Sequence, residues 1–165
     1  MMRMLLIACA LALSACGLRP MYAGGGSGVA GSSLRAIQVQ PIPGKAGWLV
    51  HKALVARLGE PGAEARYRLE VELDDNITGF GIRGDSAATR ERRTLRARYR
   101  LVDLANGGVV LDATAGSDAG IDVVSSQYAT IAAEQTALER LSEVVADQMV
   151  GRLGLYVTRR ADGGR

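Results

Sequence analysis

Hydrophobic and polar residues alternate without a break in two segments of the chain. Such alternation predicts two β-strands that are each buried on one face only. In residues 66–74 the apolar side consists of Tyr67, Leu69, Val71 and Leu73. In residues 90–102 it consists of Leu95, Ala97, Tyr99 and Leu101, and the polar side carries Arg90, Arg92, Thr94, Arg96, Arg98 and Arg100.

Two further strands are predicted at either side of this pair. Residues 34–40 are predicted to form a short strand that ends at Pro41, Pro43 and Gly44, which favour a turn. The tripeptide Asn106-Gly107-Gly108 is typical of a hairpin turn, and it leads into a segment with Val109, Leu111, Ala113 and Ala115 on one side. The sequence therefore predicts four strands in all.

Helical spacing of apolar residues predicts two helices. The first follows Gly44, with Trp48, His51, Val55 and Leu58 on one side and Arg57 opposite, and stops at Gly59 and Pro61. The second covers residues 128–156, with a stripe of Ile131, Leu138, Leu141, Val145, Met149 and Leu153. Glu139, Arg140, Glu143 and Asp147 lie away from that stripe.

The order of these elements is strand, helix, three strands, helix. Strands that are polar on one face need a cover on the other, so we predict an α+β fold with a single four-stranded mixed sheet and two helices packed on one face. A crossover through the first helix makes the first two strands parallel, and hairpins supply the others.

The N-terminal region differs in composition from this domain. Residues 1–15 contain one arginine and an apolar run from Met4 to Leu13, which is typical of a secretory signal and too short for a permanent membrane span. Residues 16–33 are rich in Gly and Ser and predict a flexible tether. We expect the domain to cover residues 34–157 and residues 158–165 to form a disordered tail.

Cys16 is the expected first residue of the mature chain. Leu13, Ser14, Ala15 and Cys16 are similar to the bacterial lipobox, in which the cysteine thiol receives a diacylglycerol. That lipid together with an N-terminal acyl chain provides stable anchoring, whereas one chain alone is marginal. The alternative is an ordinary signal peptide with a chance cysteine. In lipoproteins the residue after the cysteine influences sorting, and Gly17 favours the outer membrane.

Charge and cysteine content exclude several classes of protein. Without residues 1–15 the chain has 19 basic and 17 acidic side chains, a net charge of +2, so no strong basic field indicates nucleic-acid binding. Cys9 leaves with the signal, so no cysteine pair remains for a disulfide. His51 is the only histidine, so neither a nucleophile–base pair nor a metal site is evident. We therefore predict no catalytic residues, no metal and no cofactor.

Gly79, Gly81 and Gly84 match the spacing of a dinucleotide-binding fingerprint, and Asp103 follows at about the expected distance. That motif requires a helix directly after the glycines, whereas the next segment alternates as a strand does. We predict instead a mobile hairpin loop, 79–85, that presents Phe80 and Ile82 to a partner. The tripeptide Arg83-Gly84-Asp85 within it is interpreted as chance.

The arginine-rich side of the strands is the most distinctive surface feature. If the two alternating strands pair as a hairpin, Arg90 and Arg92 lie across from Glu72 and Asp74, and Arg98 and Arg100 across from Arg66 and Arg68. Facing like charges are destabilising, so an anionic partner over these four arginines is one interpretation. The other is a solvated surface whose arginines prevent association between sheets.

Several short motifs in one order resemble the LPS-assembly lipoprotein family LptE of alphaproteobacteria. They are Cys16-Gly17-Leu18-Arg19-Pro20-Met21-Tyr22, Pro41-Ile42-Pro43-Gly44, Tyr67-Arg68-Leu69-Glu70-Val71, Tyr99-Arg100-Leu101-Val102-Asp103, and Tyr128-Ala129-Thr130 with Ala133-Glu134. The resemblance covers nearly the whole chain.

The resemblance implies a protein without enzymatic activity. Members of the family plug the lumen of the outer-membrane LPS translocon barrel LptD, help that barrel to assemble, and bind LPS. It thus implies LptD and LPS as partners of this chain, a lipid anchor facing the periplasm, and barrel or LPS contacts through Arg66, Arg68, Arg98, Arg100, Phe80 and Ile82. An auxiliary lipoprotein of an envelope ABC-type lipid-trafficking system is the alternative.

Overall fold

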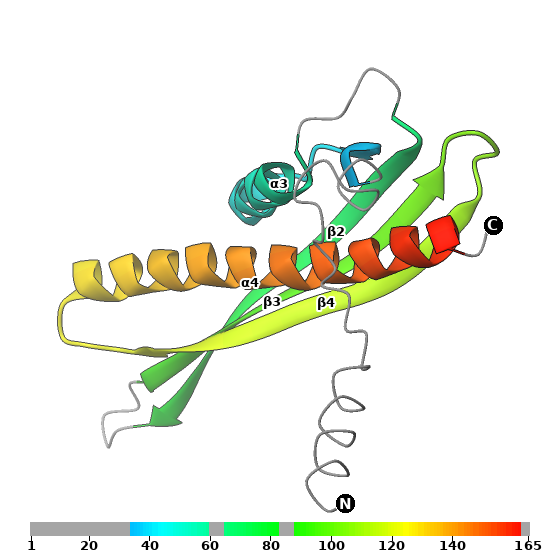
Figure 1. Cartoon of the computed structure of the whole chain (residues 1–165). Helices are drawn as coiled ribbons and strands as arrows, with labels where there is room; N and C mark the ends of the chain where they lie inside the picture. The colour runs from blue at the N-terminus through cyan, green and yellow to red at the C-terminus, as the bar shows by residue number, and fades with distance from the viewer. Residues whose placement is uncertain (1–33, 60–64, 83–87, 163–165) are drawn as a thin grey trace, which may run out of the picture.

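The structure is a computed structural model, and it describes residues 34–59, 65–82 and 88–162. In chain order its elements are β1 (Ile37–Val39), α3 (Gly44–Leu58), β2 (Tyr67–Ile82), β3 (Ala88–Asp103), β4 (Val109–Asp122) and α4 (Gln127–Asp162) (Figure 1). This confirms the predicted β-α-β-β-β-α order. The predicted signal peptide, Cys16 and the tether lie outside the described residues.

The four strands form a single sheet in the order β1-β2-β3-β4. β1 is parallel to β2, and the two other pairs are antiparallel, so the predicted mixed sheet is confirmed. β1 is shorter than the predicted strand 34–40, because residues 34 and 35 are helical and the strand begins only at Ile37. At its other end Pro41 and Pro43 cannot donate backbone hydrogen bonds, and the chain turns into α3. β2 and β3, by contrast, make a hairpin of 16 residues in each strand.

The core lies between the sheet and α4. Leu95, Ala97, Tyr99 and Leu101 are all buried on the face of β3 that α4 crosses, as predicted (Figure 1). From α4 the predicted stripe contributes Leu138, Leu141, Val145, Met149 and Leu153, all buried. Ile131 was expected in this stripe but is exposed, because the first turns of α4 extend beyond the packed part of the sheet (Figure 1).

The buried side of α3 differs from the predicted one. Trp48 was expected in the core, but 60% of its surface is exposed, and His51 is only half-buried. Leu58 is buried as predicted, but Val50 and Leu54 are buried in place of Trp48 and His51. The reason is a close approach at Gly47, where a Cβ atom would lie 2.4 Å from the carbonyl oxygen of Ile42. Because Gly47 has no side chain, α3 can pack closely against Ile42, with Val50 and Leu54 on its buried side.

The end of α4 also corrects a prediction. We expected a disordered tail from residue 158, but the helix continues to Asp162. Val157 is buried in the core, and the hydroxyl of Thr158 donates a hydrogen bond to the carbonyl of Gly154 (2.8 Å). No glycine or proline interrupts residues 155–162, so the helix has no signal to stop there. Residues 163–165 lie outside the described chain.

Candidate docking surface

The face of the sheet opposite α4 carries the even-numbered side chains of the three long strands, and we call it the open face. Its charged members are Arg68, Arg90, Arg92, Arg96, Arg98, Arg100, Glu70, Glu72, Asp74, Asp112, Asp118 and Asp122. Six arginines thus stand among six carboxylates. The open face is strongly polar but has no net charge, so it is not a basic surface.

The predicted register of the β2–β3 hairpin is wrong. Arg98 pairs with Glu72 and Arg100 with Glu70, rather than with Arg66 and Arg68. β2 continues to Ile82 and β3 begins at Ala88, so both strands are longer than the predicted segments 66–74 and 90–102. Asp75 is held in β2 by Arg93 through two hydrogen bonds of 2.8 and 2.6 Å. The cross-strand partners in the hairpin therefore differ from the predicted ones.

The arginines that we expected to repel one another are instead paired with carboxylates. Glu70 accepts a hydrogen bond from Nε of Arg68 (3.0 Å), and its other oxygen lies 3.2 Å from Nη2 of Arg100. Arg98 donates to both oxygens of Asp112 (3.3 and 3.0 Å), which lowers the pKa of that carboxyl group. Like-charge repulsion is therefore not a feature of this face.

Arg66 does not belong to this set. It precedes β2, and its guanidinium carbon lies 5.2 Å from the centre of the Tyr67 ring, in a cation–π contact. The structure thus brings Arg68, Arg98 and Arg100 together on the open face but places Arg66 beside a core tyrosine at the end of the strand.

Three charged groups of the open face have no ion pair among the described residues. They are Glu72 and Asp74 of β2, and Arg96 of β3. The side chain of Arg96 lies across Gly116 of β4, where a Cβ atom would be 2.6 Å from its Cδ and Nη1 atoms. Because Arg96 and Arg98 both lean toward β4, the two carboxylates on β2 are left without a partner.

These unpaired groups line a groove of about 670 Å³ on the sheet. Its wall on the β2 side contains Glu72 and Asp74, Arg96 lies in the middle, and Thr114 and Gly116 lie on the β4 side. The groove ends at Gln148 of α4. Both signs of charge are available within it, so a partner with charged groups can form ion pairs there.

The side chain of Gln148 binds the backbone of β4 at Gly116, on the strand edge that no other strand covers. Its side-chain oxygen accepts a hydrogen bond from the backbone N–H of Gly116 (3.0 Å), and its side-chain nitrogen donates to the Gly116 carbonyl (3.3 Å). The amide thereby occupies the place of a neighbouring strand and blocks pairing with another sheet there. Helical spacing could not have shown this contact, since Gln148 reads as an ordinary surface residue.

The expected hairpin loop is shorter than predicted. Residues 79–82 belong to β2, so only 83–85 of the predicted 79–85 loop lie outside the described residues. Phe80 is 40% exposed on the open face, and the guanidinium carbon of Arg92 lies 5.5 Å from its ring centre. Ile82 ends the strand, and its side chain is not among those described.

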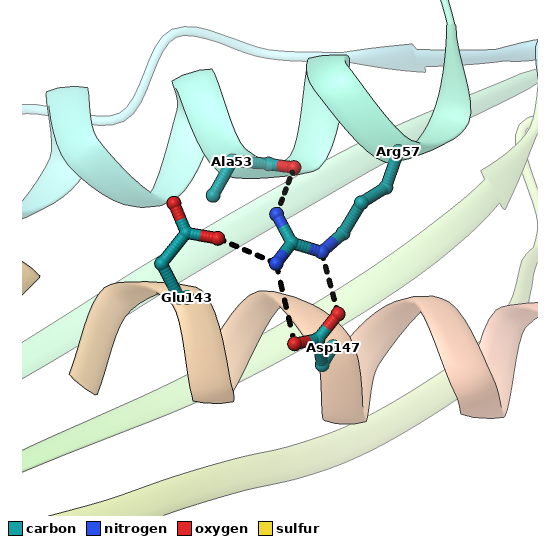
Figure 2. Close-up of polar contacts among 4 residues, drawn as sticks. All are labelled: Ala53, Arg57, Glu143 and Asp147. Atoms are coloured by element: carbon teal, nitrogen blue, oxygen red, sulfur yellow. Dashed lines mark hydrogen bonds and ion pairs between the residues drawn. The ribbon is translucent and has the colours of Figure 1, made fainter. Parts of the chain in front are cut away.

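A cluster of ion pairs, which the sequence did not reveal, connects α3 and α4. Arg57 of α3 donates to both oxygens of Asp147 (2.5 and 3.2 Å) and also to Glu143 and to the carbonyl of Ala53 (Figure 2). These bonds raise the pKa of Arg57 and lower that of Asp147. Glu143 and Asp147 are one helical turn apart, but only the packing shows that Arg57 faces them.

The described part of the chain contains neither a metal-binding group nor a membrane-spanning helix. No group of three or more His, Cys, Asp or Glu side chains there is placed to hold a metal ion. None of the described helices combines the length and apolarity needed to cross a membrane.

Comparison with protein families gives a match over nearly all of the described chain. A sequence model of the lipopolysaccharide-assembly family LptE matches residues 34–153. The chain belongs to this family. The LptE family consists of lipoproteins that are not enzymes, and its match starts where the domain predicted from the sequence starts. The expected resemblance is thereby confirmed.

Individual relatives agree with this assignment. An uncharacterized protein of Rickettsia prowazekii is 28% identical over 156 residues, which are 94% of this chain and 97% of that protein. A candidate lipoprotein of Caulobacter crescentus has a similar crystal structure, with a TM-score of 0.67, 27% identity, and coverage of 81% of this chain and 98% of that one.

A more distant structure shares the fold alone. Rare lipoprotein B of Shewanella oneidensis superposes with a TM-score of 0.58 over 78% of this chain and 98% of that one, at 7% identity. The two proteins thus have the same architecture although few of their residues are identical.

Proposed function

We propose that this LptE-family protein is an outer-membrane lipoprotein that plugs the LPS translocon barrel LptD and helps it to assemble. In this role it supports the transport of LPS to the cell surface. The family match over residues 34–153 carries the proposal, because it spans the whole sheet and most of α4.

The open face supports a position inside a barrel. The lumen of a large outer-membrane barrel is polar and hydrated, so a protein that plugs it needs a polar surface toward the lumen. Twelve charged side chains with no net charge meet this requirement. The helices cover the other face of the sheet and make the body rigid (Figure 1).

The proposed anchor is the lipid on Cys16. Two or more acyl chains hold a protein on a membrane stably, and residues 17–33 would then link the anchor to the domain. The anchor would face the periplasm, while the domain enters the lumen. We retain the outer membrane as the destination because Gly17 follows the cysteine.

Arg68, Arg98 and Arg100 remain candidates for contact with acidic groups of the lumen or with the phosphates of lipid A. A guanidinium carries five N–H donors, and the ion pair of Arg98 with Asp112 uses only two of them. The side chain of Arg98 is 63% exposed, so its remaining donors face solvent and are available to a partner. Phe80 and Ile82 would extend the contact along the hairpin.

The test is affinity purification of the full-length lipoprotein from membranes in mild detergent, followed by mass spectrometry. We expect one large outer-membrane barrel as a stable partner, with LPS. Recovery of inner-membrane transporter components instead would favour an auxiliary lipoprotein of an ABC-type lipid-trafficking system, and recovery of the protein alone would contradict the proposal.

A charge-reversed variant tests the surface itself. Arg98→Glu with Arg100→Glu should lower recovery of the barrel or of LPS. The matched control is Arg140→Glu with Arg159→Glu, which makes the same change in charge at exposed positions of α4. Equal recovery from both variants would show that the open-face arginines are only solvated.

A further inference from the structure

The outer side of α3 has a composition found nowhere else in the chain. It carries the only tryptophan, Trp48, and the only two lysines, Lys45 and Lys52. The three residues are spaced by three and four positions, so they lie on one side of the helix. All three are exposed, and we call them the α3 patch.

Trp48 of the α3 patch does not belong to the hydrophobic core. It exposes 60% of its surface, which is unusual for the largest apolar side chain of a protein. Its ring is in contact with a cation, because Nζ of Lys52 lies 5.3 Å from the ring centre. A residue with an apolar body and a cation beside it is suited to a boundary between water and an apolar phase.

The α3 patch also has uncompensated positive charge. α3 contains no Asp or Glu, and its remaining cation, Arg57, is paired with Glu143 and Asp147 on the side toward α4 (Figure 2). Neither lysine has an ion pair among the described residues. The two ammonium groups therefore point to an anionic partner outside the described domain.

The α3 patch lies on the helix beside which the described domain begins. Arg35 packs against the end of α3, where its Cγ atom is 3.2 Å from the Cβ position of Gly59. Seventeen residues, 17–33, separate Cys16 from the domain. A random coil of that length and composition has an average span of about 20 to 25 Å, which puts α3 within reach of the surface to which Cys16 would be anchored.

We propose that the α3 patch rests on the anionic phospholipid surface of the membrane that holds the lipid anchor. Trp48 enters the headgroup region, and Lys45 and Lys52 bind lipid phosphates, as aromatic and basic side chains do at membrane interfaces. The contact orients the anchored domain relative to the bilayer before the domain enters the barrel lumen. The inference rests on the lipid anchor of the proposed function, but it is independent of LptD and of LPS.

A membrane fits the α3 patch better than a protein does. Protein interfaces have an apolar centre of several residues, whereas Trp48 is the only large apolar side chain exposed on this helix. A single aromatic residue between two lysines is too small for such a centre. It is sufficient for a peripheral contact that an acyl anchor already holds in place.

Because Trp48 is the only tryptophan, its fluorescence reports directly on the α3 patch. The experiment uses the full-length lipidated protein in vesicles that contain phosphatidylglycerol and lipids with brominated acyl chains. We expect the emission of Trp48 to shift to shorter wavelength and to lose intensity by contact with the brominated lipid. Lys45→Glu with Lys52→Glu should reverse much of both changes, and high salt should weaken them.

Two controls keep the experiment decisive. Trp48→Phe combined with Tyr128→Trp moves the fluorophore to another exposed helix position, and its emission should remain that of a tryptophan in water. Arg140→Glu with Arg159→Glu should leave the Trp48 signal unchanged. An unshifted and unquenched Trp48 in protein that floats with the vesicles would overturn the inference, as would protection of Trp48 only after a protein partner is added. Failure to float would instead contradict the lipid anchor.

Discussion

The two faces of the sheet are built for different tasks. On the covered face, Leu95 and Leu101 of β3 are fully buried against α4, and the fold depends on how well they fit. On the open face of the same strand, Arg98 and Arg100 are exposed and make ion pairs that water weakens. Alternate residues of one strand thus carry either the stability of the domain or its contact with a partner.

The largest expected effect is on the covered face. Leu95→Ala should reduce the free energy of unfolding by about 2–5 kcal/mol, because it removes buried methyl groups and leaves a cavity that the rigid sheet cannot close. Chemical denaturation followed by circular dichroism measures this. A loss below about 1 kcal/mol would mean that the core is less tightly packed than the structure indicates.

The second-largest effect on stability is expected at Gly47, the buried glycine of α3. Gly47→Ala should destabilise the domain by about 1–3 kcal/mol, because the added Cβ would lie 2.4 Å from the Ile42 carbonyl oxygen. The matched control is Gly151→Ala in α4, where no atom lies within 4 Å of the Cβ position. That variant should be stabilised by up to about 1 kcal/mol through helix propensity. Equal effects of the two would contradict the close approach of α3.

The Arg57–Asp147 contact should give a smaller, pH-dependent effect. The hydrogen bond from Arg57 lowers the pKa of Asp147, so the contact stabilises the fold above the ordinary carboxyl pKa of about 3.9 and this stabilisation is lost as pH falls through the lowered pKa. Thermal melts of the wild type and Asp147→Asn should differ at pH 7 and converge below about pH 4. A difference that grows on acidification would contradict this assignment.

The smallest effect on stability is expected on the open face. Arg98→Ala removes an ion pair between exposed groups, which solvent screens, so the melting temperature should stay close to that of the wild type. Recovery of the barrel partner should nevertheless fall. If the melting temperature fell as far as in Leu95→Ala, the open face would be part of the core and not a surface for docking.

The sequence predicted which residues of the strands are buried but not how the strands pair, because side chains of a strand alternate between its two faces. Our pairing of β2 with β3 was wrong by an even number of residues, and an even shift keeps every side chain on its own face. Leu95 and Leu101 were therefore placed in the core correctly, whereas the partners of Arg98 and Arg100 were not. The register depended on whether a strand tolerates Asp75, and only the contact with Arg93 shows that it does.

The arginines of the open face could be predicted from the sequence, but the carboxylates that pair with them could not. The sequence shows the arginines of β3, yet the carboxylates that neutralise them come from β2 and β4 and depend on the register. Helical spacing placed Trp48 on the buried side of α3, whereas the small residue beside it, Gly47, decides how the helix packs. Packing between elements, which periodicity does not encode, accounts for both errors.

We propose above all that the open face contacts the barrel. A photo-crosslinking amino acid introduced at Thr114, in the groove of the open face, tests it in living cells. We predict, after irradiation, a single adduct with a large outer-membrane barrel protein, and the same partner from the exposed position Asn76 on β2. Adducts only with inner-membrane transporter components, or no protein adduct from either position, would contradict the account.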